Sequence, residues 1–449
     1  MVSLKLGRLS RWASATVLLP AALTSSAALR AQSPSETTFP DAGASALVTP
    51  SVRAFRFADG GDDLPGRLTT DASGNFYVAA QLSNDSLHPS SFGVLKYRFD
   101  GTLQGAFHYR PAAGEFGGLA RDVKVDKLGN IYAVGDTSLG GLVVSFTASG
   151  SQRWARHFST SAVALAVDGT GNVYAAGTRV TGDFQGEWLV AKYTGAGQLL
   201  WTRNHTGTAH GDVRLTDIRL DPVGNPVVLG TTNILVTTVA NTMTTLKLDV
   251  QGNKLWARDF VAVQFTPQTP YGLAVDRAGN VYATGSTTPP EGIPVPFTVK
   301  YDLSGNRKFV LTGSGSGGAS VAIDPSGDLL LVGVGFVQGL PSGIAASKVH
   351  PNGVKVWTTR LATGQKIVSD ATGNAFVAGS IVNDDPTTAG PSDYLVTKLS
   401  PSGAVVFQFR YSPGDDVSDA AVDPFGNLLV TGSGQNAQFE HEIFTLRLK

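Results

Sequence analysis

The sequence of 449 residues contains no cysteine, and only 16% of its residues are charged. Without cysteine the chain can form no disulfide framework, Cys-ligated zinc site, iron–sulfur cluster or thiol nucleophile. Glycine is abundant, with 53 residues, and hydrophobic residues make up 42% of the chain, which is enough for a sizeable core. These proportions argue against a disordered, collagen-like or coiled-coil chain.

The start of the chain has the pattern of an export signal. Lys5, Arg8 and Arg11 form a positive segment, an apolar run follows over residues 12–23, and small residues up to Ala31 supply a cleavage site. The apolar run is shorter than the ~20 residues that a membrane-spanning helix needs, and no later segment is a transmembrane candidate. The sequence therefore predicts a chain that is exported.

We expect three parts: a signal peptide at 1–31, a flexible leader at 32–50 that is rich in Ser, Thr, Pro and Ala, and a single domain at 51–449. Loss of the signal removes four basic residues and no acidic one, leaving 31 basic and 35 acidic residues. A nucleic-acid partner requires a basic face, so none is expected. The mature protein is expected in the periplasm, at the cell surface or outside a bacterial cell, in an oligomeric state that the sequence does not indicate.

A repeat organises the remainder of the sequence. The pattern Asp-x-x-Gly-Asn, with Asp for Asn in one copy, recurs eight times and is followed each time by an alternating apolar run. In one copy the expected strands are 271–276, 281–286, 297–302 and a strand that starts at 307. Asp suits such a turn because it accepts hydrogen bonds from the following amides, and Gly supplies the left-handed conformation. The aspartates of the eight copies are Asp71, Asp126, Asp168, Asp221, Asp276, Asp324, Asp370 and Asp423.

Four-stranded units at a spacing near 50 residues predict an all-β fold, a β-propeller. The eighth copy has only three strands, at 417–423, 427–433 and 442–448, whereas the segment Val52–Phe57 has the pattern of a fourth strand. Pairing this segment with the last strand would close the ring and cover both exposed strand edges. We predict eight antiparallel four-stranded blades closed by the N-terminal strand, with seven blades as the alternative.

Two copies of the repeat carry a family resemblance. AVDGTGNVYAAGT (Ala166–Thr178) and AVDRAGNVYATGST (Ala274–Thr287) resemble the SBBP-type, seven-bladed β-propeller-like repeats of bacterial exported proteins. The lead-in Gly-Asp-Asp of these repeats is present at Gly61–Asp63 and Gly414–Asp416. The resemblance covers residues 51–449 and implies a propeller fold and export, but no shared catalytic residues.

The connections between strands divide into two classes. The connections from the first to the second strand and from the third to the fourth are short and alike. The other connections, such as residues 232–242, are long and differ from blade to blade. In an up-and-down blade the variable connections share one face, which we call the variable-loop face, and binding residues usually lie on such loops. The ligand-binding candidates on this face are Trp188 and Tyr394, which begin third strands, and Asp62, Asp63, Asp415 and Asp416, where blades one and eight adjoin.

Residues that recur in every blade are expected to stabilise the blade. Basic residues recur in the third strand, and we expect them to pair with neighbouring acids, while tryptophans of the fourth strand pack the outer edge. Each turn offers a single carboxylate, whereas calcium requires several. We therefore expect no metal and no cofactor. The basic residues are Lys96, Lys192, Lys247, Lys300, Lys348, Lys398 and Arg447, and the tryptophans are Trp154, Trp201, Trp256 and Trp357.

No motif for nucleophilic, metal-dependent or phosphate chemistry is present, so no residue is predicted to be catalytic. The sequence favours an exported non-enzymatic scaffold that binds a protein or a glycan through its variable-loop face. It does not decide whether the chain is an enzyme. The alternatives are a structural cell-surface protein and an enzyme on the same fold, namely a lyase, hydrolase or quinoprotein.

Overall fold

The computed structural model describes residues 49–449 except for 59–60, 84–89, 112, 182–184, 207–212, 237, 264–265, 290–291, 293, 314–316, 336–342, 383–391, 415 and 436–439. The predicted signal at 1–31, and the predicted leader up to residue 48, lie outside the described residues and stay predictions. Among the described residues, no helix is long and apolar enough to cross a membrane.

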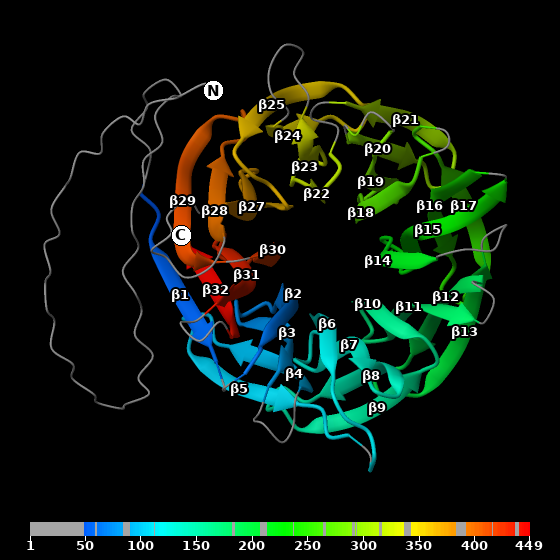
Figure 1. The fold of residues 1–449 in the computed structure, drawn as a ribbon, viewed down its shortest axis with the longest axis vertical. Helices are drawn as coiled ribbons and strands as arrows, with labels where there is room; N and C mark the ends of the chain where they lie inside the picture. Colours follow the sequence, from blue (N-terminus) through cyan, green and yellow to red (C-terminus); the bar gives the residue numbers. More distant parts are fainter. Residues whose placement is uncertain are drawn as a thin grey trace, which may run out of the picture. The chain divides into compact units, whose positions relative to one another are not determined.

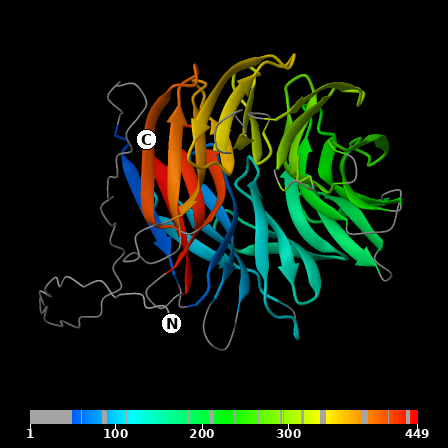
Figure 2. The same ribbon diagram turned by 45° about the horizontal axis from the view of Figure 1, so that its top comes forward.

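Thirty-two strands form eight antiparallel four-stranded sheets, arranged as the blades of a ring (Figure 1). The first strand of each blade lies nearest the centre of the ring, and the fourth lies at its rim. The strands of each blade run across the thickness of the ring, as the tilted view shows (Figure 2). The prediction of an eight-bladed propeller is confirmed.

The first and second strands form the inner half of each blade. The first strands are β2 (Leu64–Thr70), β6 (Leu119–Val125), β10 (Ser161–Val167), β14 (Arg214–Leu220), β18 (Gln268–Val275), β22 (Ser320–Ile323), β26 (Lys366–Ser369) and β30 (Asp416–Val422). The second strands are β3 (Phe76–Leu82), β7 (Ile131–Thr137), β11 (Val173–Thr181), β15 (Pro226–Val236), β19 (Val281–Thr287), β23 (Leu329–Gly335), β27 (Ala375–Val382) and β31 (Leu428–Gln435).

The outer half of each blade is formed in the same way. The third strands are β4 (Ser91–Tyr97), β8 (Gly140–Phe146), β12 (Gln185–Tyr193), β16 (Thr238–Leu248), β20 (Val295–Tyr301), β24 (Gly343–Val349), β28 (Ser392–Leu399) and β32 (His441–Leu448). The fourth strands are β5 (Leu103–His108), β9 (Gln152–Phe158), β13 (Leu199–Thr206), β17 (Lys254–Phe260), β21 (Arg307–Thr312), β25 (Lys355–Leu361), β29 (Val405–Gly414) and, for blade eight, β1 (Val52–Phe57).

The N-terminal strand closes the ring. β1 pairs antiparallel with β32, with Val52 opposite Leu448 and Phe57 opposite Ile443. The Phe55 ring packs 5.8 Å from the Phe76 ring of blade one, so β1 also joins blade eight to blade one. The closure predicted from the sequence is therefore consistent with the structure in both partners and direction.

The repeated turn has the geometry that its residues predict. In blade one, the side chain of Asp71 accepts hydrogen bonds from the amides of Ser73 and Asn75, at 2.8 and 3.0 Å. Gly74 has a φ of +76°, which a residue with a side chain rarely adopts. In all eight blades the backbone amide of the turn aspartate donates to the carbonyl of the residue four positions later, as Asp71 does to Asn75. These aspartates therefore form hairpin turns.

Six of the turn aspartates have one of two further partners. A tyrosine hydroxyl six residues later donates to the carboxylate in three blades, and a basic residue of the third strand forms an ion pair with it in three others. The tyrosine pairs are Tyr77–Asp71, Tyr132–Asp126 and Tyr282–Asp276, at 3.0, 2.9 and 3.0 Å. The ion pairs are Lys247–Asp221, Lys348–Asp324 and Arg447–Asp423, at 2.8, 2.6 and 3.0 Å. The predicted pairing of third-strand cations with acids is confirmed in these three blades.

The tryptophans of the fourth strands form hydrogen bonds with the neighbouring blade. Trp154 donates to the carbonyl of Gly195 at 3.0 Å, and Arg156 donates to that of Gly197 at 2.9 Å, both in a turn of the next blade. A Cβ on Gly197 would lie 2.6 Å from the Trp154 ring, so only glycine fits there. The predicted packing role of the tryptophans is confirmed. Trp201, Trp256 and Trp357 donate to Val250, Leu303 and Pro401 in the same way.

One predicted loop is a hairpin. We expected residues 232–242 to be a variable connection, but β15 and β16 continue to Val236 and from Thr238, with Thr232 opposite Thr242. The segment is rich in Thr, Val and Ile, which suit a strand, and the long pairing satisfies backbone groups that a loop would leave to solvent.

Because β1 closes the propeller, we expect that loss of the Phe55 side chain strongly lowers the free energy of unfolding. Phe55→Ala removes a buried side chain, only 8% exposed, between blades eight and one, and we expect a loss of about 3 kcal/mol in the free energy of unfolding. Arg53→Ala, at an exposed position of the same strand, should change it by less than about 0.5 kcal/mol. Urea unfolding measures both, and equal stability of the two variants would contradict the packing role of β1.

The turn aspartates predict an acid-labile fold. Burial opposes the charge of Asp168, but bonds from Thr170 and Asn172 outweigh it, so its pKa lies below the ordinary 3.8. The pKa values of Asp126, Asp221, Asp324 and Asp370 are lowered similarly. Because the unfolded chain then takes up protons first, the free energy of unfolding should fall as the pH drops below about 4. Urea unfolding at pH 7, 5 and 3 tests this, with equal stability at pH 7 and 3 as the contradicting result.

Candidate binding site at the mouth of the central channel

Charged side chains recur at one position of the inner strands, four residues before each turn aspartate. Six inner strands have a bulge at or next to this position, which shifts their pairing with the second strand. Such bulges re-aim side chains. In blades one to eight the position holds Arg67, Asp122, Ala164, Asp217, Gly272, Ser320, Lys366 and Asp419.

The carboxylates at this position accept hydrogen bonds from backbone amides. Those of Asp122 and Asp217 are buried, and that of Asp419 is half-buried. Asp122 is 0% exposed and accepts a bond at 3.1 Å from the amide of Leu165 in the next inner strand. Asp419 accepts a bond at 3.0 Å from the amide of Leu68 in the same way. These carboxylates therefore join neighbouring inner strands, and their negative charge needs cations nearby.

Arg67 links strands of three blades. Its guanidinium, which starts from β2, lies 2.7 Å from Asp217 in β14 and 3.4 Å from Asp122 in β6. It also donates to the carbonyl of Thr216 at 3.0 Å. Burial disfavours the charge of Arg67, but these carboxylates and Asp419 outweigh burial and raise its pKa. Arg67 therefore stays charged and connects blade one to blade four.

Other cations complete the network and have exposed ends. Lys124 lies 2.5 Å from Asp122, Arg219 lies 2.9 Å from Asp217, and Lys366 lies 4.0 Å from Asp419. Burial would raise the pKa of Asp217, but Arg219 and Arg67 lower it below the ordinary value. The side chains of the cations are 23–44% exposed, whereas those of Asp122 and Asp217 are at most 5% exposed. The channel wall thus presents cations in front of buried carboxylates.

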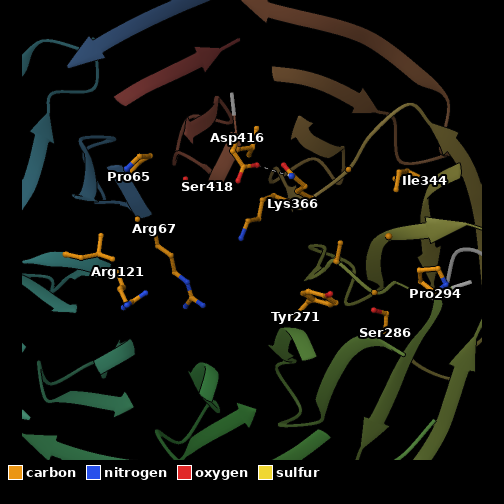
Figure 3. Close-up of a pocket in the computed structure, with 18 of the residues that line it drawn as sticks. Pro65, Arg67, Arg121, Tyr271, Ser286, Pro294, Ile344, Lys366, Asp416 and Ser418 are labelled. Atoms are coloured by element: carbon orange, nitrogen blue, oxygen red, sulfur yellow. Dashed lines mark hydrogen bonds between the residues drawn. The ribbon is translucent and has the colours of Figure 1, made fainter. Parts of the chain in front are cut away.

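Two cavities lie along the inner strands. The mouth cavity, of about 720 Å³, is lined by the beginnings of inner strands and by ends of second strands, so it opens on the variable-loop face. The inner cavity, of about 470 Å³, is lined by the later residues of the inner strands. Arg67, Tyr271 and Lys366 line both cavities, and Arg121 lines the mouth (Figure 3).

Four side chains point into the opening of the mouth cavity in Figure 3: those of Arg67, Arg121, Lys366 and Tyr271. Arg121 is fixed by Asp136, with its Nε 2.9 Å from the carboxylate, and keeps 42% of its side chain exposed. Tyr271 is the extra residue of the β18 bulge and is 49% exposed. Most other lining residues are small, so these four side chains dominate the chemistry of the mouth.

The two aromatic candidates from the sequence lie inside the blades. Trp188 is 0% exposed and packs between blades three and four, 5.3 Å from the His205 ring. Tyr394 is also 0% exposed, and its hydroxyl donates to the carbonyl of Ser433 in blade eight at 2.8 Å. Neither lines the two cavities. The structure therefore places both rings in the packing between blades.

The acidic candidates are separated by the fold. Asp63 is 0% exposed and accepts a bond from the amide of Ser83 at 2.9 Å, while exposed Asp62 accepts one from the amide of His441. Asp416 lines the mouth cavity and accepts bonds from Gln365 and Ser380, at 3.1 and 3.2 Å. Asp415 lies outside the described residues. In the described part of the chain, no group of three or more His, Asp or Glu residues is placed to hold a metal ion.

Sequence reasoning missed Arg67, Arg121, Lys366 and Tyr271. A signal was available for Arg67 and Lys366, because aligning the eight copies on their turn aspartates places charged residues repeatedly four positions before the turn. Arg121 lies five positions before its turn aspartate and does not share this signal. Tyr271 was assigned to a strand, but its position in a bulge was not apparent from the alternation of the strand.

The comparison with family models matches residues 267–288, the first hairpin of blade five, to the SBBP family, described as a beta-propeller repeat. The chain is a β-propeller that carries an SBBP repeat. The predicted SBBP repeat is thereby confirmed at residues 267–288, whereas export and bacterial origin stay predictions. No curated protein has a significantly similar sequence.

Several solved structures are similar to this chain at low sequence identity. Sqt1 from Chaetomium thermophilum is 10% identical, with 87% of this chain and 97% of that chain covered and a TM-score of 0.57. Virginiamycin B lyase from Staphylococcus aureus is 9% identical, with 89% and 100% covered and a TM-score of 0.46. The WD40 propeller domain of Doa1 is 10% identical, with 86% and 93% covered and a TM-score of 0.42. At these identities the likeness concerns the fold alone.

The Arg67 network predicts that loss of this one cation destabilises the ring. Arg67→Leu leaves the buried carboxylates of Asp122 and Asp217 with fewer cations, and we expect a loss of about 3 kcal/mol in the free energy of unfolding. Arg307→Leu, at an exposed position of β21 at the rim, is the matched control and should change it by less than about 0.5 kcal/mol. If urea unfolding shows equal effects, Arg67 does not hold the inner strands together.

Proposed function

We propose that this chain is a binding scaffold whose ligand enters the mouth cavity on the variable-loop face. The observation that carries the proposal is the grouping of Arg67, Arg121, Lys366 and Tyr271 around one concave opening. A volume of about 720 Å³ lies within the usual range for sites that bind small molecules or chain segments. A few convergent polar groups in such a cavity fix the orientation of a ligand.

The rigidity of the surrounding ring supports the same proposal. The mouth residues start from inner strands that are paired within blades and joined between blades by Asp122, Asp419 and Arg67. Residues fixed in this way lose little conformational freedom when a ligand binds, which favours affinity. The N-terminal pattern of residues 1–31 supports a proposed location outside the cytoplasm, where the ligand is a protein segment or a glycan.

A variant with a blocked mouth tests the proposed site against many ligands at once. Binding of the chain to a glycan array and to a displayed-peptide library would be compared with that of Ser418→Trp, which puts a large ring into the cavity lining. Leu128→Trp is the matched control, since Leu128 is 85% exposed in the Asp126 turn at the opposite end of the strands. Thermal unfolding would establish that both variants are folded.

We expect specific array binding that Ser418→Trp reduces by about tenfold or more, as expected for the loss of at least ~1.4 kcal/mol of binding free energy, and that Leu128→Trp leaves unchanged. Binding that both variants retain would place the site elsewhere on the molecule. A chain that binds no glycan and no peptide would contradict the scaffold proposal itself.

A further inference from the structure

The mouth cavity contains one aromatic ring that no packing requirement explains. Tyr271 occupies the extra position of the β18 bulge, where the bulges of β6, β10, β14 and β30 have Arg121, Val163, Thr216 and Ser418. With 49% of its surface exposed, the ring contributes little to the core but lines both cavities. An exposed aromatic face inside a cavity can stack on a flat ligand surface, and one face of a pyranose ring offers such a surface of C–H groups.

Cations line the same cavity as this ring. Among the described residues, the carboxylate that forms an ion pair with Lys366 is Asp419, at 4.0 Å, and one third of the Lys366 side chain is exposed. Arg121 donates to Asp136 through Nε and one terminal nitrogen, and its side chain is 42% exposed. Among the described residues that line the mouth, Arg67, Arg121 and Lys366 are the cations and Asp416 is the anion. Each of these cations has a carboxylate partner, so a ligand carboxylate would be bound by the exposed donor groups of Arg121 and Lys366 and not by a net positive charge of the cavity.

The remainder of the lining favours a sugar over a protein segment. Small residues such as Gly66 and Gly364 line the opening and offer backbone polar groups. The apolar side chains of the lining are Pro65, Leu119, Pro294, Ile344 and Val417, so Tyr271 is the one aromatic side chain among the described lining residues. Protein interfaces depend on large apolar or aromatic anchors that are buried in matching pockets. A hydrated, hydroxyl-rich ligand needs fewer such contacts and is served by backbone amides and carbonyls.

We propose that the mouth cavity binds an oligosaccharide that contains uronic acid. Tyr271 stacks on a sugar ring, and Lys366 and Arg121 bind the carboxylate of that ring or of the next one. This inference rests on the proposed function and adds the class of ligand. Arg67 lines both cavities but is held by Asp217 and Asp122, so Lys366 and Arg121 are the proposed contacts of the ligand carboxylate.

Calorimetric titration of the whole chain tests the class of ligand. The probes are the tetrasaccharides of galacturonate, mannuronate and hyaluronan, with fully methyl-esterified tetragalacturonate as the neutral counterpart and sodium acetate as the bare carboxylate. We expect at least one acidic tetrasaccharide to bind, with an affinity that falls as salt increases. The methyl ester and acetate should each bind at least about tenfold more weakly, because each lacks one of the two contacts.

Two variants and their matched controls identify the contacts. Lys366→Gln should weaken binding of the acidic tetrasaccharide about tenfold, as for the loss of one charge-assisted hydrogen bond, and reduce its salt dependence. Tyr271→Ala should weaken it about tenfold without changing the salt dependence. Lys127→Gln and Phe425→Ala replace an exposed lysine and an exposed aromatic residue in turns on the opposite face, and should leave binding unchanged.

Each contrary result has a distinct meaning. Absence of binding to all three acidic tetrasaccharides, or equal binding of the methyl ester, overturns the inference. Equal binding of acetate also overturns it, because the cavity would then be a simple anion site. If peptides bind the array in a manner that Ser418→Trp blocks while acidic sugars do not bind, the proposed function stands and the inference fails.

Discussion

The pairing of β1 with β32 holds the ring closed, and the position of every inner strand depends on that closure. Residues from the two ends of the described chain form one blade, with Val52 opposite Leu448. The hydrophobic cluster around Phe55 then includes residues of blades one and eight, so both sides of the closure are packed together. Within the ring, the Arg67–Asp217 pair also joins β2 to β14.

The two faces of the propeller differ in how strongly their residues repeat from blade to blade. On one face the repeated turns and the tryptophan contacts use the same residue types from blade to blade, and these residues stabilise each blade and its neighbour. At six of the turn aspartates either a tyrosine or a third-strand cation binds the carboxylate, as at Asp71 and Asp221. On the variable-loop face the inner strands begin with unlike residues, and there the cavity opens.

The repetition made the fold predictable from the sequence. The turn pattern depends on bonds within five residues, so Asp71, Gly74 and their equivalents could be recognised without tertiary information. The strand Val52–Phe57 was also predictable, because a ring of four-stranded blades needs one more strand than the eighth copy contains. Export, the signal at 1–31 and the leader at 32–50 rest on sequence pattern alone.

The site was less predictable because it depends on bulges and on contacts between distant blades. Trp188 and Tyr394 follow variable connections, but the direction of their side chains depends on the register of β12 and β28, which places both in the core. Arg67 and Asp217 are 150 residues apart, and no local pattern joins them. The bulge that carries Tyr271 departs from the regular alternation from which the strand itself was predicted.

The measurement that tests ring closure most directly is thermal unfolding of a chain that begins at residue 58, alone and with a peptide of residues 49–58, beside the full-length chain. Without β1, the edge of β32 and the cluster around Phe55 lose their cover, so we expect a lower unfolding temperature. The peptide should restore most of the difference, and a peptide with the same residues in scrambled order should not. If the chain that begins at residue 58 unfolds at the same temperature as the full-length chain, β1 does not close the ring.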